Sequence, residues 1–236
     1  MAFRTPNGIA VTNTSTSNPS VTMPTGAAVG DRALCFVIQD TNGTTITPPS
    51  GWTATEITNA NCSGPDGQTF RLFEKKQLDG TEGASQTWTA PNNSAKFIIV
   101  CFTGRHATNA LSFATPTVNT TSDGTTPRTI TATTGTAASG DDIVAVFQCD
   151  QQSAAAVWNF SNWTNSLIER DDSATTWISA GTATIDNVAA GSFGGGSTSV
   201  DITLTGSNNT GWSAIVVGIP AAAGGGSDTL MGQACL

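Results

Sequence analysis

Few residues of this 236-residue chain have the type and spacing that catalysis requires. His106 is the only histidine, and no Ser or Cys motif accompanies it that would make it a general base. We expect it to be a surface-loop residue. The glutamates are scattered and could form the carboxylate pair of a glycosidase only through folding; they are Glu56, Glu74, Glu82 and Glu169. The sequence therefore predicts no catalytic residue, and we expect a protein that is not an enzyme.

Metal and cofactor sites are not predicted either. Asp141-Asp142 and Asp171-Asp172 could contribute to a calcium site, but neither pair has the alternating ligand spacing of a calcium-binding loop. Gly140-Asp141 instead repeats Gly30-Asp31 directly before an apolar run. A short carboxylate in such a turn can accept hydrogen bonds from its own backbone, which is the role that we expect for Asp141.

The five cysteines have no metal-binding spacing, because no two are closer than 27 residues. Cys35, Cys101 and Cys149 lie in apolar runs and are predicted to be reduced core residues. Cys62 and Cys235 lie in polar or Gly-rich surroundings, so a disulfide between subunits through either of them stays open.

The tryptophans divide into a matched pair and an unmatched group. Trp52 and Trp163 follow similar turns at equivalent positions of an internal repeat, which predicts equivalent core residues. The unmatched residues are either further core residues or exposed platforms for stacking sugars, and they are Trp88, Trp158, Trp177 and Trp212.

Composition restricts the fold and the partners. Forty threonines and 21 serines, with 25 glycines and only 26 charged residues, favour β-strands and turns over helices. The net charge of −8 includes only nine cationic residues, which argues against nucleic-acid binding. No apolar run approaches the eighteen residues of a membrane span, and the first residues lack the pattern of a signal peptide, so we expect synthesis in the cytoplasm.

An internal duplication is the most informative feature of the sequence. Blocks of residues recur in the same order, with an offset that grows only as small loop insertions would require. Residues 30–40 match 140–150 at an offset of 110, residues 50–53 match 161–164 at 111, and residues 97–102 match 214–219 at 117. We therefore expect a first repeat at residues 1–105 and a second at 106–220.

Each repeat is predicted to form short strands in a β-sandwich or jelly-roll-like half. The expected strands of the first half are 9–13, 20–24, 33–39, 52–58, 68–77, 85–90 and 95–103. Those of the second are 113–119, 128–134, 142–149, 163–169, 174–186, 198–205 and 212–219. Residues 33–38, 97–102, 143–147 and 214–219 are continuously apolar, which predicts central strands covered on both faces. We expect the halves to pack together, as two sandwiches or as one.

Residues 221–236 differ from the rest of the chain. A Gly-rich hinge precedes a short apolar segment, which predicts a tail that docks on a neighbouring molecule.

Several short motifs resemble those of structural proteins from tailed bacteriophages. The motifs are Val29-Gly30-Asp31 before an apolar strand, Thr47-Pro-Pro-Ser-Gly-Trp-Thr53, Phe70-Arg-Leu-Phe-Glu-Lys-Lys76 with Gly80-Thr-Glu-Gly83, and a strand that ends in Phe102-Thr-Gly104. The resemblance implies a β-sandwich or jelly-roll module of the virion, of the capsid decoration, tail or fibre type, without catalytic residues.

From this resemblance we expect a capsid decoration protein or another component of the particle surface, located in the virion after assembly in the host cytoplasm. Its partners would be other virion proteins and copies of itself. A tail-fibre or receptor-binding module that recognises a host surface glycan is the alternative.

Overall fold

The computed structural model describes an all-β protein. Within the described residues there are eighteen strands and no helix. The described residues are 3–4, 7–40, 45–55, 69–90, 93–105, 107–114, 117–119, 127–133, 135–150, 159–174, 178–188, 191–192, 199–205 and 211–222. None of these residues belongs to a helix that is long and apolar enough to cross a membrane.

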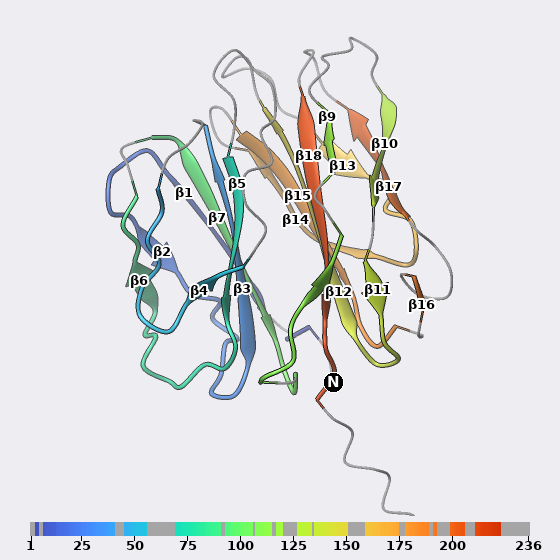
Figure 1. Ribbon diagram of the computed structural model, residues 1–236. Helices are drawn as coiled ribbons and strands as arrows, with labels where there is room; N and C mark the ends of the chain where they lie inside the picture. The colour runs from blue at the N-terminus through green and yellow to red at the C-terminus, as the bar shows by residue number, and fades with distance from the viewer. Residues whose placement is uncertain are drawn as a thin grey trace, which may run out of the picture.

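The strands of the first half form a five-stranded antiparallel sheet, the first main sheet (Figure 1). Its order is β1 (Ile9–Thr14), β7 (Ala95–Phe102), β3 (Arg32–Gln39), β5 (Thr69–Lys75) and β4 (Thr53–Ala54). The central strand β3 pairs along its whole length with β7, from Arg32 opposite Phe102 to Gln39 opposite Ala95. A separate pair, β2 (Ser20–Thr22) and β6 (Ser85–Thr87), forms the first outer sheet.

The second half repeats this plan. The second main sheet has the order β14 (Ile168–Ala174), β15 (Ile178–Ile185), β12 (Asp142–Asp150), β18 (Trp212–Ile219) and β8 (Ser112–Phe113), and β9 (Thr117–Asn119) also pairs with β18. Its outer strands are β10 (Arg128–Thr133), β17 (Ser199–Thr205) and β13 (Asn159–Ser161), together with the pair β11 (Thr136–Ala137) and β16 (Gly191–Ser192). Strands β12, β18 and β15 thus correspond to β3, β7 and β5.

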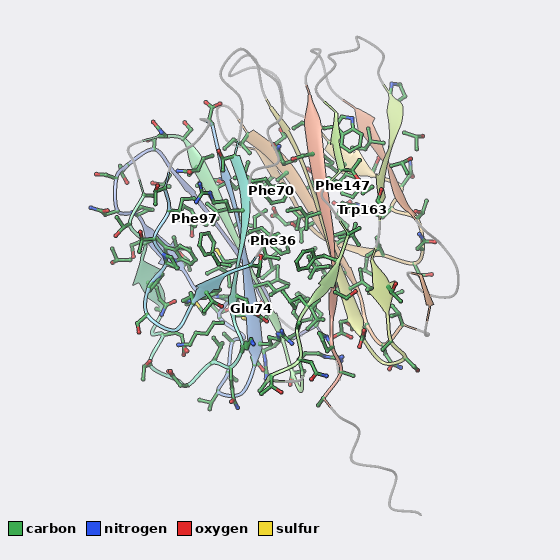
Figure 2. The ribbon with its side chains drawn as sticks, viewed as in Figure 1. Phe36, Phe70, Glu74, Phe97, Phe147 and Trp163 are labelled. Carbon is green, nitrogen blue, oxygen red and sulfur yellow. The ribbon has the colours of Figure 1, made fainter. Side chains whose placement is uncertain are left out.

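The sheets stack in four layers with three apolar cores between them (Figure 1). The two main sheets lie in the middle and share one core, to which Phe36 and Phe70 contribute from one side and Val146 and Ile215 from the other. The outer sheets cover the remaining faces. Figure 2 shows Phe97 on the outer side of the first main sheet, and Phe147 and Trp163 on the outer side of the second. The halves therefore pack together as two sandwiches whose main sheets face each other.

The shared core is built from large side chains on one side and smaller ones on the other. At positions related by the repeat, Phe36 corresponds to Val146 and Phe70 to Ala180. All four side chains are completely buried. The two main sheets therefore contribute side chains of different size to the shared core at these two positions of the repeat.

The prediction of central strands covered on both faces is confirmed. Strands β3, β7 and β18 are buried at every residue, as is β12 from Asp142 to Cys149. Strand β2 meets water on one face, because Val21 is buried between exposed Ser20 and Thr22.

Some predicted strands were wrong. Of the predicted strand 163–169, only Ile168 and Glu169 belong to a strand, because Asn165 and Ser166 adopt positive φ angles of 58° and 59°. Predicted strand 174–186 is instead the end of β14 and the antiparallel strand β15, with Ala174 paired to Ser179. Within the described part of predicted strand 52–58, only Thr53–Ala54 forms a strand. Predicted strand 113–119 is divided between β8 and β9, and β11, β13 and β16 were not predicted.

The duplication extends to individual hydrogen bonds. Gly30 donates its N–H to Leu78 O and Leu78 donates to Asp31 O, both at 2.8 Å. Gly140 donates to Val188 O and Val188 donates to Asp141 O, also at 2.8 Å. The two glycines have φ angles of 88° and 87°, a conformation that side chains rarely adopt. The same turn thus begins the central strand of both halves.

Candidate functional site

A buried lysine joins the two main sheets. Lys96 on β7 is 0% exposed and donates to the carbonyl oxygen and to Oγ of Ser173 on β14, each at 2.5 Å. Ser173 Oγ in turn donates to Asp171 Oδ2 at 2.6 Å. Burial lowers the pKa of Lys96 to about 8, although Asp171 and Asp172 oppose this change. Sequence analysis did not single out Lys96, yet it is the only charged residue in the run Ala95–Phe102.

This cluster has the residue types of a serine nucleophile with a lysine base. The direction of its hydrogen bonds is the reverse of the one that such a pair needs. The Lys96 ammonium group donates to Ser173 Oγ, and the Ser173 hydroxyl donates to Asp171. A serine that acts as a nucleophile must give its proton to the base. The arrangement therefore supports a structural link between the sheets.

Two further ion pairs lie at the end of the main sheets where β3 and β12 begin. Arg105 pairs through Nε with Asp142 Oδ2 at 2.9 Å and donates to Gly140 O at 2.8 Å. Arg32 pairs with Glu74 and also donates to Asn109 O at 2.8 Å, which links the first half to the segment before β8. Burial raises the pKa of Asp142 to about 7, against the opposing effects of the Asn187 N–H and of Arg105.

The two Gly-Asp turns lie at this same end. Asp31 accepts the Ala28 N–H at 3.0 Å and Asp141 accepts the Ala138 N–H at 2.7 Å, so the predicted role of Asp141 is confirmed. The turns differ in what else they bind. Asp31 pairs with the guanidinium of Arg4, whereas Asp141 accepts the Ala221 N–H at 3.0 Å.

An open apolar groove lies beside the first Gly-Asp turn. It has a volume of about 530 Å³ and is formed by residues 22–25 and 27–29 on one side and Leu78, Gly80 and residues 82–84 on the other. Val29 at its edge is 70% exposed, the largest exposed fraction among the large apolar side chains of the described residues. Exposed apolar surface beside a concavity is typical of a binding site.

The loop on one side of the groove is held by its own charges. Lys75 pairs with Glu82 at 2.6 Å and with Asp79 at 3.3 Å. Glu82 also accepts the N–H groups of Asp79 at 3.0 Å and Gly80 at 2.9 Å. Hydrogen bonds from Thr81 lower the pKa of Asp79 to about 2. The loop is thus fixed in a conformation that leaves the groove open.

The second half lacks this opening. The shared hydrogen bonds relate Gly30 to Gly140 and Leu78 to Val188, an offset of 110. Extended to the neighbouring residues, this offset aligns residues 26–27 with β11 and residues 81–82 with β16. In the second half these segments pair directly, Thr136 with Ser192 and Ala137 with Gly191. In the first half the corresponding segments form no described strand pair, and they border the groove. The groove therefore occupies the place of a β-pairing that the other half makes.

The structure places the tryptophans of the described residues in cores. Trp52, Trp88 and Trp212 are 5%, 0% and 6% exposed. Trp163 is partly buried against Phe147, with ring centroids 5.5 Å apart. The prediction of equivalent core residues is confirmed for Trp52, and in part for Trp163, which packs against the corresponding core of the second half. Trp52, Trp88 and Trp212 are too deeply buried to be sugar-stacking platforms. Trp158 and Trp177 lie outside the described residues.

The other candidate residues are dispersed. Glu74, Glu82 and Glu169 contact Arg32, Lys75 and Trp163 respectively, at three different places. Cys35, Cys101 and Cys149 are buried free thiols, as predicted. His106, Glu56, Cys62, Cys235 and residues 223–236 of the tail lie outside the described residues. Among the described residues, no group of three or more His, Cys, Asp and Glu side chains could hold a metal ion.

Comparison with known proteins gave no significant match to a protein-family model, to a curated protein or to a solved structure.

Proposed function

We propose that this protein is a non-enzymatic structural component of a bacteriophage virion, a capsid decoration protein or another component of the particle surface. The observation that carries the proposal is the use of buried charged side chains to join the two halves. Buried Lys96 binds Ser173 and buried Arg105 binds Asp142. The partly buried Asp186 adds a third contact, because it accepts the Phe3 N–H at 2.8 Å. These contacts favour a rigid unit, which is what a shell component needs.

The resemblance of the sequence motifs supports the same class of protein. Val29-Gly30-Asp31 and Gly80-Thr-Glu-Gly83, two of the motifs that carry the resemblance, lie at the groove and at the turn beside it. The glycan-binding alternative required exposed tryptophans, and the two described residues of the unmatched group, Trp88 and Trp212, are buried in cores. The structural role is therefore the function that we propose.

Quantitative mass spectrometry of purified particles tests this proposal. A surface component of the shell will be present at a copy number comparable with that of the major capsid protein. Particles assembled without it will regain thermal stability when the purified chain is added. Absence of the chain from purified particles would overturn the proposal, and a copy number of only a few per particle would assign it to a tail or fibre.

A further inference from the structure

We propose that the groove of the first half binds the C-terminal segment, residues 229–236, of a second copy of this chain as an added extended segment. This inference rests on the proposed function, because it supplies the contact by which copies would join in a shell. It deepens that function by naming the partner and the two surfaces that meet.

The repeat indicates what kind of ligand the groove accepts. Where β11 and β16 pair in the second half, the first half has residues 26–27 and 81–82 on either side of a cavity of about 530 Å³. Glu82 fixes the loop on its side of the groove through its bonds to Lys75 and to the Asp79 and Gly80 N–H groups. The two sides are joined at their ends, where the Met23 N–H binds Ala84 O at 3.0 Å and the Gly30 N–H binds Leu78 O at 2.8 Å, and the groove lies between these bonds. A gap between two segments that pair elsewhere in the same fold suits an inserted extended peptide.

The lining of the groove favours an uncharged apolar peptide. The apolar side chains that line it are those of Met23, Pro24, Ala27, Ala28, Val29, Leu78 and Ala84. The one charged residue that lines it is Glu82, which is 7% exposed and already paired with Lys75. A charged peptide would find no free partner of opposite sign among these lining residues.

The C-terminal segment has this chemistry. Residues 229–236 read Thr-Leu-Met-Gly-Gln-Ala-Cys-Leu and carry no charged side chain. In an extended conformation, alternate residues share a face, so Leu230, Gly232, Ala234 and Leu236 would lie together. That face would be wholly apolar, and the small side chains at Gly232 and Ala234 would let the peptide backbone approach the groove closely.

The length and the starting point of the tail permit this contact. Ala222 is the last described residue, and the segment before it is held on the second half, where Asp141 accepts the Ala221 N–H at 3.0 Å. Fourteen residues follow and can span at most about 50 Å. The groove lies on the first half, so a tail that leaves the second half of one copy and enters the first half of the next makes a head-to-tail contact. Such contacts extend an assembly through many copies.

Two substitutions in the full-length chain test the inference. Val29→Asp places a charge at the exposed edge of the groove, and Ile168→Asp places one at the other large exposed apolar residue, 56% exposed on β14. Size-exclusion chromatography with light scattering should show concentration-dependent association of the unsubstituted chain and of Ile168→Asp. We expect Val29→Asp and Leu230→Asp to weaken this association at least about tenfold. Equal unfolding midpoints of all variants will show that they are folded.

A free peptide of residues 227–236 provides the second measurement. Labelled peptide should bind the Leu230→Asp chain and not the Val29→Asp chain, and excess unlabelled peptide should dissociate the oligomers. Association that survives Val29→Asp would overturn the inference. Peptide binding with a chain that stays monomeric at every concentration would also overturn it, because each tail would then occupy its own groove. Neither result bears on whether the chain is found in virus particles. The proposed function is tested by that separate measurement and could hold even if this inference failed.

Discussion

Gly181 shows how closely the outer layer of the second half approaches its main sheet. Gly181 on β15 lies against Phe160 on β13, and a Cβ atom at this glycine would be 2.7 Å from Cβ and Cγ of Phe160. Phe160 is buried, as are Ala180 and Thr182 on either side of Gly181, so neither β13 nor β15 has much room to move. The absence of a side chain at position 181 therefore sets the distance between the layers.

We predict that Gly181→Ala lowers the free energy of unfolding by about 1–3 kcal/mol, the usual cost of an overpacked core. Gly218→Ala on β18 is the matched control, because its Cβ would meet Ser112 Cβ at 3.4 Å, an ordinary contact. Denaturant titrations of the two variants check the prediction. Equal destabilisation would show that the contact with Phe160 does not limit the packing.

Asp172 makes stability depend on pH. Burial raises its pKa from 3.8 to about 6, and Glu169 and Asp171 add to this, whereas the Phe160 N–H and Lys96 oppose it. A carboxyl group with a raised pKa in the folded state stabilises the fold fully below the unfolded-state pKa. That contribution is lost as the pH rises from about 4 to about 6.

We predict that Asp172→Asn removes this part of the pH dependence. The amide keeps an oxygen that can accept the Phe160 N–H, which Asp172 accepts at 3.0 Å. One proton changes stability by at most about 1.4 kcal/mol per pH unit, and partial exposure reduces that figure. Unfolding free energies measured from pH 4 to 7 should fall less steeply in the variant. The decrease in stability that the variant still shows up to pH 7 belongs to Asp142. If the variant and the unsubstituted chain lose stability equally steeply between pH 4 and 7, the assignment to Asp172 is wrong.

At the scale of elements, Lys96 joins β7 to β14 across the two main sheets. A lysine whose pKa is lowered from 10.5 to about 8 in the folded state destabilises the fold at neutral pH. Stability is then regained as the pH rises from about 8 to about 10.5. Replacing a buried charge by an apolar side chain of similar size is often neutral or stabilising.

We therefore predict that Lys96→Met is at least as stable as the unsubstituted chain at pH 7 and does not gain stability above pH 8. Lys96→Ala leaves a cavity at the same place and should be less stable by about 2–4 kcal/mol. Thermal unfolding at pH 7, 8, 9 and 10 separates the two variants. Equal losses of stability in both would mean that the bond to Ser173 outweighs the cost of burying the charge.

Sequence patterns predicted the strands whose own residues indicate their structure. Continuous apolar runs identified β3, β7, β12 and β18, because only a strand covered on both faces tolerates them. The predicted strand through Asn165 and Ser166 was wrong, since nothing in those residues alone requires positive φ angles. The division of predicted strand 174–186 into the end of β14 and the separate strand β15 was missed, because Ala174, Thr175 and Thr176 carry no turn signal.

The groove could not be predicted, because it depends on residues far apart in the chain. Val29 and Glu82 are separated by more than fifty positions, and either segment alone resembles a polar or small-residue loop. The signal that could have indicated it is the comparison of the repeats. Residues 136–137 and 191–192 form strands, whereas their counterparts 26–27 and 81–82 form no described strand, and Glu82 stabilises the loop at residues 79–82.

At the scale of the whole molecule, the shared core determines whether the halves can unfold separately. Side chains of the first main sheet such as Phe36, Phe70 and Phe102 share this core with Val146, Ala180 and Ile219 of the second. Separating the halves would expose this entire layer to water, at a cost of about 25 cal/mol for each square ångström of apolar surface. Half-unfolded molecules should therefore be unstable relative to both the folded and the fully unfolded state.

We predict a single cooperative unfolding transition, and two substitutions in separate cores test it. Val37→Ala lies in the outer core of the first half and Val216→Ala in that of the second. Each should lower the midpoint of the same transition, by about 1–3 kcal/mol in free energy, and the double variant should lose the sum of the two. Calorimetry and tryptophan fluorescence should agree, because Trp52 and Trp88 report on one half and Trp163 and Trp212 on the other. Independent halves would instead give two transitions, of which each substitution moves only one, and the layer between the main sheets would then be an interface between two autonomous sandwiches.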